Sequence, residues 1–345
     1  MLWDDAIQNT WINTGEPWGS PALEQAAPTK PAASSSAGLR RIRCFYHGLA
    51  WPVRRSANRP YFVYRGAGVA LPPLDILDAD DPRVADYRRL KERWLNTEGG
   101  RFVAESERVV RRLIGSGLRV HSVLLTGPRL ATLSDALGGP FPVYLAPQEL
   151  LDRIAGFHVH RGCLAIGERP SAAAAAIPDG ARTLLVLEDL TDVDNLGAIA
   201  RHAAAFGADA LLLSPRCADP FYRKSIRVSL GAVFTLPIIR LAVWPGDLQR
   251  LRAEGVSLVA ATLDANATPL ARFDRPARLA VLLGAEGPGL SPAARAVCDQ
   301  RVTIPMSPGA DSLNVATAAA IFLYALTRAP AGGTPGILFR VPGSN

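Results

Sequence analysis

Cysteine is scarce in this chain of 345 residues, and its cysteines are scattered. No two of them have C-x-x-C spacing, which argues against a disulfide or zinc framework and for reduced thiols in a cytoplasm. His158 and His160 form an H-x-H pair, but no further candidate ligand stands near them in the sequence. We therefore expect no metal site. The cysteines are Cys44, Cys163, Cys217 and Cys298.

A secretory leader and long hydrophobic runs are also missing. The first residues, MLWDDAIQNTW, carry acids where a leader needs a basic segment followed by an apolar one. The longest apolar run, near residues 315–326, contains Thr317 and is shorter than the roughly 20 residues that span a membrane. The sequence thus predicts a soluble, cytoplasmic protein with no membrane partner. Its 48% of hydrophobic residues are enough to fill the cores of two domains.

Lysine is nearly absent: it occurs only at Lys30, Lys91 and Lys224, so arginine carries the net charge of +7 and the pI of about 9.6. Arginine suits bidentate contact with phosphate and stacking on bases. The bias favours a nucleic-acid partner, but a GC-rich genome produces the same composition without any ligand. Composition alone leaves both explanations open.

The usual nucleotide-binding motifs are missing too. The stretch LLGAEGPGLS (282–291) is rich in glycine, but its G-x-x-G-x-G spacing belongs neither to a dinucleotide fold nor to a phosphate loop. It also carries a lone carboxylate, Glu286, which would repel a bound phosphate. These features disfavour a dinucleotide oxidoreductase.

Composition and periodicity divide the chain into five segments. Residues 1–70 contain a Pro/Ala/Ser-rich stretch without helical or strand period, so we expect a disordered or loosely held extension. A translation start near Val69 would place this extension outside the native protein. Residues 72–168 and 182–330 are typical of two α/β domains, joined by an alanine-rich linker at 169–181 and followed by a tail at 331–345.

The first α/β domain begins with apolar residues at helical spacing, namely Val84, Tyr87, Leu90 and Trp94. After them we expect strands in RFVAES, HSVLLTG, PFPVYLAP and HRGCLAIGE, and helices in ERVVRRLIGSG and PQELLDRIAG. This alternation predicts a small α/β unit.

In the second domain, short apolar strands alternate with helices, which indicates a mostly parallel sheet covered on both faces. The expected strands are TLLVLEDL, ADALLLSP, AVFTLPII, VSLVAATL, RLAVLLG and RVTIP. The expected helices are NLGAIARHAAAFG, DPFYRKSIRVSLG, DLQRLRAEG, SPAARAVCD and SLNVATAAAIFLYALTR. Ligands of such sheets bind beyond the carboxyl ends of the strands, and LLGAEGPG lies at such an end.

Three stretches of this domain carry a family resemblance: DNLGAIARHAAAFGADALLLSP (194–215), LLGAEGPGLS (282–291) and IPMSPGADSLNVATAAAIFLY (304–324). In order and spacing they resemble the three signature motifs of the SpoU (TrmH-type) RNA ribose 2′-O-methyltransferases, within the SPOUT superfamily. The first domain looks like the ribosomal-protein-like RNA-binding domain of many members. The resemblance implies a SPOUT-type parallel sheet with a C-terminal trefoil knot, S-adenosylmethionine as methyl donor, no metal, and a homodimer.

The resemblance also assigns site residues. The catalytic positions are matched by Asn195, Arg201, Glu286, Ser312 and Asn314. The cofactor-binding positions are matched by Leu283, Gly284, Glu286, Gly287, Ile304, Met306, Ser312, Leu313, Asn314 and Ala316.

The first motif, N-x-G-x-x-x-R, places Asn195, Gly197 and Arg201 at the start of a helix that Asp194 or Asn195 can cap. The resemblance implies that Arg201 faces the RNA, and the arginine at this position is often described as the general base of the family. A guanidinium stays protonated in almost every protein setting. We therefore expect Arg201 to stabilise the developing alkoxide, while a phosphate or water takes the proton.

The second and third motifs supply an acid and two polar residues. S-adenosylmethionine is a cation, so Glu286 need not repel it, and we favour a role in which Glu286 bonds backbone or Asn195 and fixes its loop. A carboxylate that touches the reacting groups stays the alternative. Ser312 and Asn314 can cap the last helix and bond neighbours across the site.

The predicted function is methylation of a ribose 2′-hydroxyl in structured rRNA or tRNA, with 23S rRNA favoured. The alternative is a non-catalytic RNA-binding or ribosome-assembly factor with the same fold. A solvated surface is the competing explanation for most of the RNA-binding candidates. These candidates are Arg88, Arg89, Lys91, Arg93, Arg101 and Arg201.

Overall fold

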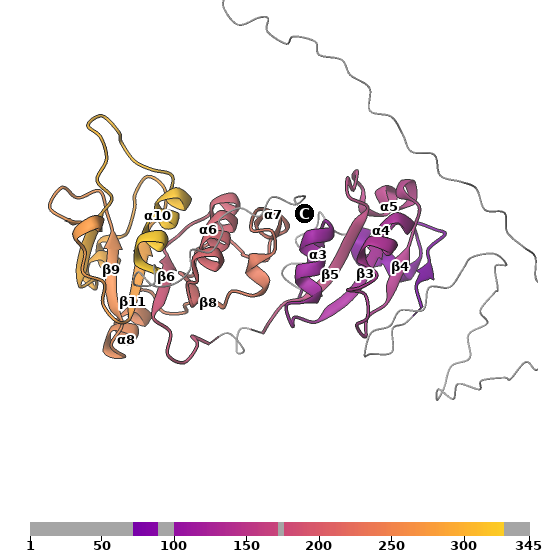
Figure 1. Cartoon of the computed structure of the whole chain (residues 1–345), viewed down its shortest axis with the longest axis horizontal. Helices are drawn as coiled ribbons and strands as arrows, with labels where there is room; N and C mark the ends of the chain where they lie inside the picture. Colours follow the sequence, from indigo (N-terminus) through magenta and orange to yellow (C-terminus); the bar gives the residue numbers. More distant parts are fainter. Residues whose placement is uncertain (1–71, 89–99, 172–175, 328–345) are drawn as a thin grey trace, which may run out of the picture. The chain divides into compact units, whose positions relative to one another are not determined.

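The structure, a computed structural model, describes residues 72–88, 100–171 and 176–327. The predicted extension at 1–70 and tail at 331–345 lie outside these residues, as does the stretch 172–175 of the predicted linker. The described residues form two separate β-sheets flanked by helices (Figure 1).

The first sheet has the strand order β1-β4-β3-β5-β2. It is mixed, because β1 and β3 run parallel to β4 whereas β5 runs antiparallel to both β3 and β2. Its strands are β1 (Leu74–Asp75), β2 (Arg101–Glu105), β3 (Val120–Leu125), β4 (Val143–Leu145) and β5 (Cys163–Glu168). Its helices are η1 (Pro82–Val84), α1 (Ala85–Arg88), α3 (Glu107–Ile114), α4 (Gly127–Leu133) and α5 (Gln148–Ala155).

The four strands and two helices expected after residue 100 are therefore confirmed. The sequence did not predict α4, whose first turn contains Pro128 directly after Gly127. Both residues usually suggest a turn, but proline is well tolerated in the first turn of a helix, where its missing N–H has no intrahelical partner. Of the stretch in which Val84, Tyr87, Leu90 and Trp94 have helical spacing, the structure describes only the part up to Arg88.

The second sheet has the order β10-β12-β9-β11-β6-β7-β8, and all its neighbouring strands are parallel. Its strands are β6 (Thr183–Leu187), β7 (Ala210–Leu213), β8 (Ile238–Arg240), β9 (Ser257–Ala261), β10 (Thr268–Pro269), β11 (Leu279–Leu283) and β12 (Gln300–Thr303). Its helices are α6 (Val193–Phe206), α7 (Arg223–Val228), η3 (Ala232–Phe234), α8 (Gly246–Ala253), η4 (Leu270–Arg272), α9 (Pro292–Ala296) and α10 (Val315–Thr327). The predicted parallel sheet is confirmed.

Alternate side chains of β6 reach opposite faces of this sheet, as a strand's period of two requires. Leu185 and Leu187 belong to the apolar cluster that includes residues of α6 and α10. Leu184 and Val186 belong to a different cluster, with residues of α8 and α9. Helices thus cover both faces, which explains why the central strands are apolar at every position.

Three boundaries differ from the sequence-based expectation. The run AVFTLPII was expected to be one strand, but Ala232–Phe234 is a 3-10 turn and only Ile238–Arg240 pairs in the sheet. Gly231 has φ 77° and turns the chain there, and the apolar run reflects burial of all three turn residues in the core. Helix α7 is shorter than DPFYRKSIRVSLG, and α10 begins at Val315, after Ser312.

The chain enters the sheet in an order that positions the ligand end. From β6 the chain adds β7 and then β8 on one side. It then crosses to the other side of β6 to form β9, and β11 later fills the place between β6 and β9. The carboxyl ends of β12, β9 and β11 are consequently neighbours. None of the described helices is long and apolar enough to cross a membrane.

Candidate active site

A pocket of about 530 Å³ lies where β9, β11 and β12 end. This volume falls in the range of small-molecule sites, and the carboxyl edge of a parallel sheet is where such ligands bind. Nine of the ten cofactor-binding positions assigned by resemblance line it. They are Leu283, Gly284, Glu286, Gly287, Ile304, Met306, Ser312, Leu313 and Asn314.

Several pocket residues had not been singled out in the sequence. Ala261, Thr262 and Leu263 come from the end of β9, a strand outside all three motifs. Asp311 adds a second carboxylate to the lining, in addition to that of Glu286. The signal that could have found the β9 residues is the sheet-edge rule itself, applied to VSLVAATL as well as to RLAVLLG.

The glycine-rich loop after β11 folds back on itself at Gly284. Ala285 and Gly289 form an isolated antiparallel bridge, in which the Gly289 N–H donates to the Ala285 carbonyl at 2.9 Å. A Cβ on Gly284 would lie 2.0 Å from the Gly289 carbonyl carbon and 2.2 Å from the Leu290 nitrogen. Only glycine fits there, and its lack of a side chain lets the backbone form this wall of the pocket.

One hydrogen-bonded cluster joins the three sequence motifs. Glu286 Oε1 accepts a hydrogen bond from Asn195 Nδ2 at 2.7 Å and another from Asn314 Nδ2 at 3.2 Å. Asn314 Nδ2 also donates to Asn195 Oδ1 at 2.9 Å. These residues come from α6, the glycine-rich loop and the start of α10, and we call them the Asn–Glu–Asn cluster. Hydrogen bonds to a carboxylate are stronger than neutral ones, so the cluster fastens the loop to two helices.

Asn314 has a second role as the cap of α10. Its Oδ1 accepts hydrogen bonds from the backbone N–H groups of Ala316 at 2.9 Å and Thr317 at 3.3 Å. These groups have no intrahelical partner at a helix start, and this explains why the helix begins at Val315. Capping orients the amide so that its nitrogen faces Glu286.

The cap of α6 is Asp192, so the expectation that Asp194 or Asn195 caps this helix was wrong. Asp192 Oδ1 accepts hydrogen bonds from the N–H groups of Asp194 at 2.7 Å and Asn195 at 2.9 Å. Asp194 instead pairs with Lys224 at 2.6 Å, which raises the pKa of the Lys224 ammonium. Asn195 lies within the first turn of α6, and its side chain donates to Glu286 instead of capping the helix.

Gly197, the middle residue of the first motif, has a packing role. A Cβ on it would lie 2.8 Å from the Ser225 carbonyl oxygen and 3.0 Å from Val228 Cβ. Ser225 and Val228 belong to α7, so Gly197 lets α6 and α7 approach closely. The motif glycine therefore fixes the position of α6, which carries both Asn195 and Arg201.

The structure does not bring every assigned residue into the pocket. Arg201 is exposed on α6 and has no hydrogen bond or ion pair with any other described residue. Ser312 lines the pocket but its side chain makes no hydrogen bond within the described part of the chain. Ala316 is buried in the first turn of α10 and does not line the pocket, and its contact with the cofactor stays a prediction.

His202, the neighbour of Arg201, joins the two helices of the first and third motifs. Its Nδ1 lies 3.1 Å from the Ala316 carbonyl oxygen. Burial lowers the pKa of His202, and the positive charge of Arg201 lowers it further, although the hydrogen bond to Ala316 acts in the opposite direction. A neutral imidazole that donates from Nδ1 therefore ties α6 to α10.

Glu188 is a structural residue of the site that sequence reasoning missed. It is 3% exposed at the end of β6, and its N–H donates to the carbonyl of Leu283, where the glycine-rich loop starts. Its carboxylate accepts hydrogen bonds from the Ser291 hydroxyl at 2.6 Å, the Ser291 N–H at 2.8 Å and the Trp244 indole N–H at 2.6 Å. Glu188 thus holds both ends of the loop.

Among the other polar candidates, Arg88 and Arg101 are occupied within the protein. Arg88 donates to the carbonyls of Ala79 and Asp81, and Arg101 pairs with Asp86. Their RNA contacts stay a prediction, and Arg89, Lys91 and Arg93 lie outside the described residues. No group of three or more potential metal ligands occurs in the described part of the chain, where His158 bonds Asp152 and the cysteines are free thiols.

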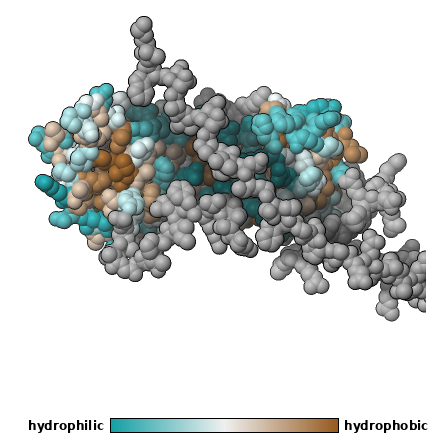
Figure 2. Space-filling model, turned by 45° about the horizontal axis from the view of Figure 1, so that its top comes forward, coloured by the Kyte–Doolittle hydropathy of each residue, from teal (hydrophilic) through white to brown (hydrophobic). Residues whose placement is uncertain are grey.

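The surface around the pocket is partly apolar. Figure 2 shows apolar surface at the left, over the region that holds β9, β11 and α10 in Figure 1. Leu263 and Leu313 line the pocket and are 61% and 38% exposed. The lining of the pocket therefore combines exposed apolar side chains with the carboxylates of Glu286 and Asp311.

Comparison with known proteins gives the class of the chain. The model of the SpoU rRNA methylase family matches residues 182–324, the region that holds the seven-stranded sheet and the Asn–Glu–Asn cluster. An uncharacterised tRNA/rRNA methyltransferase of Mycobacterium bovis is 43% identical over 263 residues, which are 74% of this chain and 91% of the relative. The chain belongs to the SpoU family and is an RNA methyltransferase.

More distant relatives add detail. The 23S rRNA (guanosine(2553)-2′-O)-methyltransferase RlmP of Bacillus subtilis is 28% identical over 73% of this chain and 98% of its own length. The SpoU methyltransferase AviRb of Streptomyces viridochromogenes, solved with AdoMet, aligns with a TM-score of 0.61 and 28% identity over 72% of this chain and 97% of its own. An AdoMet-bound rRNA methyltransferase of Sinorhizobium meliloti aligns with a TM-score of 0.64 and 25% identity over 73% of this chain and 96% of its own.

Proposed function

We propose that this protein transfers the methyl group of S-adenosylmethionine to a ribose 2′-hydroxyl of structured rRNA or tRNA, with 23S rRNA favoured. The observation that carries the proposal is the Asn–Glu–Asn cluster, which fastens the glycine-rich wall of a 530 Å³ pocket at the carboxyl edge of a parallel sheet. The activity of RlmP, a 23S rRNA guanosine 2′-O-methyltransferase, supports the ribose 2′-oxygen and 23S rRNA. The non-catalytic alternative is not favoured, because the relatives are methyltransferases.

The pocket residues fit S-adenosylmethionine by their chemistry. The cofactor carries a sulfonium and an amino group, and the pocket offers the carboxylates of Glu286 and Asp311. Its adenine needs apolar walls and close backbone, and the pocket offers Leu283, Ile304 and Leu313 around the bare backbone of the loop. When bound, the cofactor supplies an activated methyl group, so the protein has to position the acceptor and manage one proton.

The Asn–Glu–Asn cluster holds the loop rigid, and Glu286, whose Oε1 takes both amide donors, is a positioning residue. Arg201, exposed on the helix α6 that also carries Asn195, faces the RNA and stabilises the oxyanion that forms as the 2′-hydroxyl loses its proton. Because its guanidinium stays protonated, a phosphate or water accepts the proton.

Two features of the family's architecture are part of the proposal. The insertion of β11 between β6 and β9 supports a backbone threaded into a trefoil knot around the pocket. Apolar surface near α10, where Tyr324 is 43% exposed, supports a homodimer formed through this region. Residues 72–168 would be the RNA-binding domain and 182–330 the methyltransferase domain.

The experiment that tests the proposed function is a map of ribose methylation across rRNA and tRNA from cells with and without the gene. We expect one 2′-O-methyl site to disappear with the gene and to return with the wild-type chain. A chain with Arg201→Ala should not restore it. A methylation map that is identical in both strains would overturn the proposed function.

Glu188 provides a prediction about the loop. Glu188 accepts hydrogen bonds from the Trp244 indole N–H and from the N–H and hydroxyl of Ser291. In a Glu188→Gln variant, the side-chain NH₂ group must face at least one of these donors, so one hydrogen bond is lost. This loss should lower the free energy of unfolding by about 1–3 kcal/mol. Release of the loop end should also weaken S-adenosylmethionine binding roughly tenfold, equivalent to about 1.4 kcal/mol. Denaturant unfolding and calorimetry measure the two effects.

Asp209→Asn is the matched control. Asp209 also accepts two backbone N–H groups, those of Arg182 and Thr183, but at the opposite end of β6. The control should lose stability and keep its cofactor affinity. If both variants bind S-adenosylmethionine equally well, Glu188 has no role in holding the loop.

A further inference from the structure

A row of arginines lies on one face of α3, far along the chain from the three motifs. Arg108, Arg111 and Arg112 stand at i, i+3 and i+4, which puts them on the same side of the helix. Val109, Val110 and Leu113 are buried on the other side. Like charges four residues apart destabilise a helix by roughly 0.2–0.5 kcal/mol, so this arrangement has a cost unless an anion binds.

A fourth arginine completes a cleft on this face. Arg161 stands just before β5 in the sequence, and the fold brings it to α3. The cleft has a volume of about 560 Å³ and is lined by Glu107, Arg108, Arg111, Arg112 and Arg161. All of its lining residues are charged, and four of them are positive. We call it the α3 arginine cleft.

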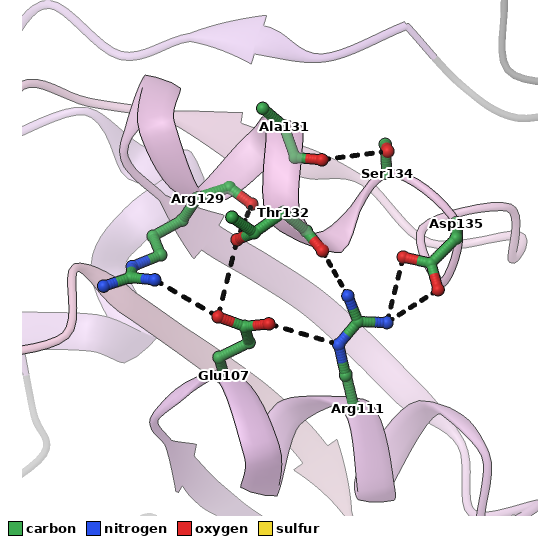
Figure 3. A network of polar contacts seen from close by, with 7 residues as sticks. All are labelled: Glu107, Arg111, Arg129, Ala131, Thr132, Ser134 and Asp135. Atoms are coloured by element: carbon green, nitrogen blue, oxygen red, sulfur yellow. Dashed lines mark hydrogen bonds and ion pairs between the residues drawn. The ribbon is translucent and has the colours of Figure 1, made fainter. Parts of the chain in front are cut away.

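The carboxylates near this cleft are already neutralised (Figure 3). Glu107 accepts hydrogen bonds from Arg111 Nε at 3.3 Å and from Arg129 Nη1 at 3.2 Å. Arg111 also donates to both carboxylate oxygens of Asp135, at 2.8 and 2.9 Å, and these hydrogen bonds, together with the positive charge of Arg111, lower the pKa of Asp135. These contacts join α3 to α4 and leave more positive than negative charge in the cleft.

The remaining arginines are free to bind something else. Arg108 and Arg161 are exposed and form no hydrogen bond or ion pair with any described residue. Arg112 is also exposed, and its Nη1 donates to the Leu230 carbonyl, a neutral group, at 3.0 Å. No carboxylate in the described part of the chain pairs with any of these three guanidinium groups.

We propose that the α3 arginine cleft binds backbone phosphates of the RNA substrate and so positions it for methylation. The inference rests on the proposed function for its substrate. Arginine presents its N–H donors as a planar fork that matches phosphate oxygens, and a cleft with this charge attracts a polyanion. The proposed RNA contact thus lies on a different surface from Arg88 and Arg101, the candidates suggested by the sequence.

The lining distinguishes backbone phosphates from other partners. Protein interfaces depend on aromatic or aliphatic anchors in pockets, and base recognition in single strands depends on aromatic stacking. The cleft offers neither, because none of its lining residues is apolar or aromatic. Phosphate contacts fix register and orientation without reading sequence. Loss of the cleft should therefore weaken RNA binding without changing which nucleotide is methylated.

An Arg108→Ala/Arg161→Ala double variant tests the proposal, since neither side chain holds the fold together. RNA affinity is measured at several salt concentrations with rRNA and tRNA fractions as probes. Each lost phosphate contact should reduce the slope of log K against log salt by about 0.7–0.9, so the double variant should lose up to about two units of slope. KM for RNA should rise about tenfold while kcat and the methylated nucleotide stay the same.

An Arg250→Ala/Arg295→Ala double variant is the matched control, because both arginines are exposed, on α8 and α9, and their loss removes the same two positive charges. Calorimetry with S-adenosylmethionine checks that the pocket is intact in all variants. If the wild type methylates RNA and the double variant keeps the wild-type salt slope and KM, the cleft is not an RNA site. If the wild type transfers no methyl group but the cleft variants lose salt-dependent RNA binding, the proposed function fails and the cleft assignment stands.

Discussion

Replacing Gly284 with alanine is expected to weaken S-adenosylmethionine binding at least about 100-fold, equivalent to roughly 2.7 kcal/mol. The added Cβ would lie 2.0 Å from the Gly289 carbonyl carbon, whereas carbon atoms pack at about 3.5–4.0 Å. The neighbouring atoms belong to the backbone, so no side chain can rotate away. The loop must open at the Ala285–Gly289 bridge, and this removes one wall of the pocket.

Gly255→Ala separates this effect from a general loss of stability. Gly255 has φ 81° in the turn before β9, and a Cβ on it meets no atom within 4 Å. It should cost about 1–2 kcal/mol of backbone strain and leave cofactor affinity unchanged. Calorimetric titration of both variants with S-adenosylmethionine decides the question. A dissociation constant within threefold of the wild-type value for Gly284→Ala would show that the loop can adapt.

Replacing Glu286 with alanine is expected to slow methyl transfer about 100-fold or more, whereas Glu286→Gln should stay within about tenfold of the wild type. The physical reason is the direction of the hydrogen bonds: one carboxylate oxygen accepts from both Asn195 and Asn314. A glutamine carbonyl can accept the same two hydrogen bonds, more weakly because it is neutral. Single-turnover rates with saturating cofactor and RNA measure the effect.

A double-mutant cycle with Asn195→Ala makes this test sharper. If the two side chains act as one unit, the double variant with Glu286→Ala should be little slower than either single variant. Contrary results would be equal, large losses in Glu286→Gln and Glu286→Ala with normal cofactor affinity in both. The carboxylate charge would then act on the reacting groups, the alternative to a bracing role.

Local patterns in the sequence were enough to predict most of the secondary structure. The strands with continuous apolar runs, such as β6 and β11, and the helices with a clear apolar face, such as α3 and α5, lie where periodicity predicts them. The run AVFTLPII was misassigned because burial on all sides produces the same apolar signal in a 3-10 turn as in a central strand. The short strand β10 gave no such signal.

The site shows a different limit. The sequence placed Glu286 in a tight glycine loop and suggested Asn195 as its partner, and the structure contains that hydrogen bond. The resemblance to a family supplied the pairing, since the two residues lie 91 positions apart and no local pattern joins them. Glu188 escaped notice because a single acid at a strand end has no signature, and its role depends on where Ser291 and Trp244 lie in the fold.

The α3 arginine cleft was missed for a related reason. The i, i+3, i+4 spacing of its helix arginines was readable in ERVVRRLIG, but a charged helix face is usually just solvated. Two features distinguish the charged face of α3. Arg161, which lies outside α3, lines the same cleft, and Glu107 and Asp135 already accept hydrogen bonds from Arg129 and Arg111. Both facts belong to tertiary structure, which the spacing alone cannot specify.

The most direct test of the account is methyl transfer by the purified protein in vitro. The protein is incubated with S-adenosylmethionine labelled in its methyl group and with rRNA or tRNA from cells lacking the gene, and the digested nucleosides are then analysed by mass spectrometry. We expect label in a 2′-O-methylnucleoside and none in the bases. Label on a base, or no label in RNA from a protein that binds both cofactor and RNA, would contradict this expectation.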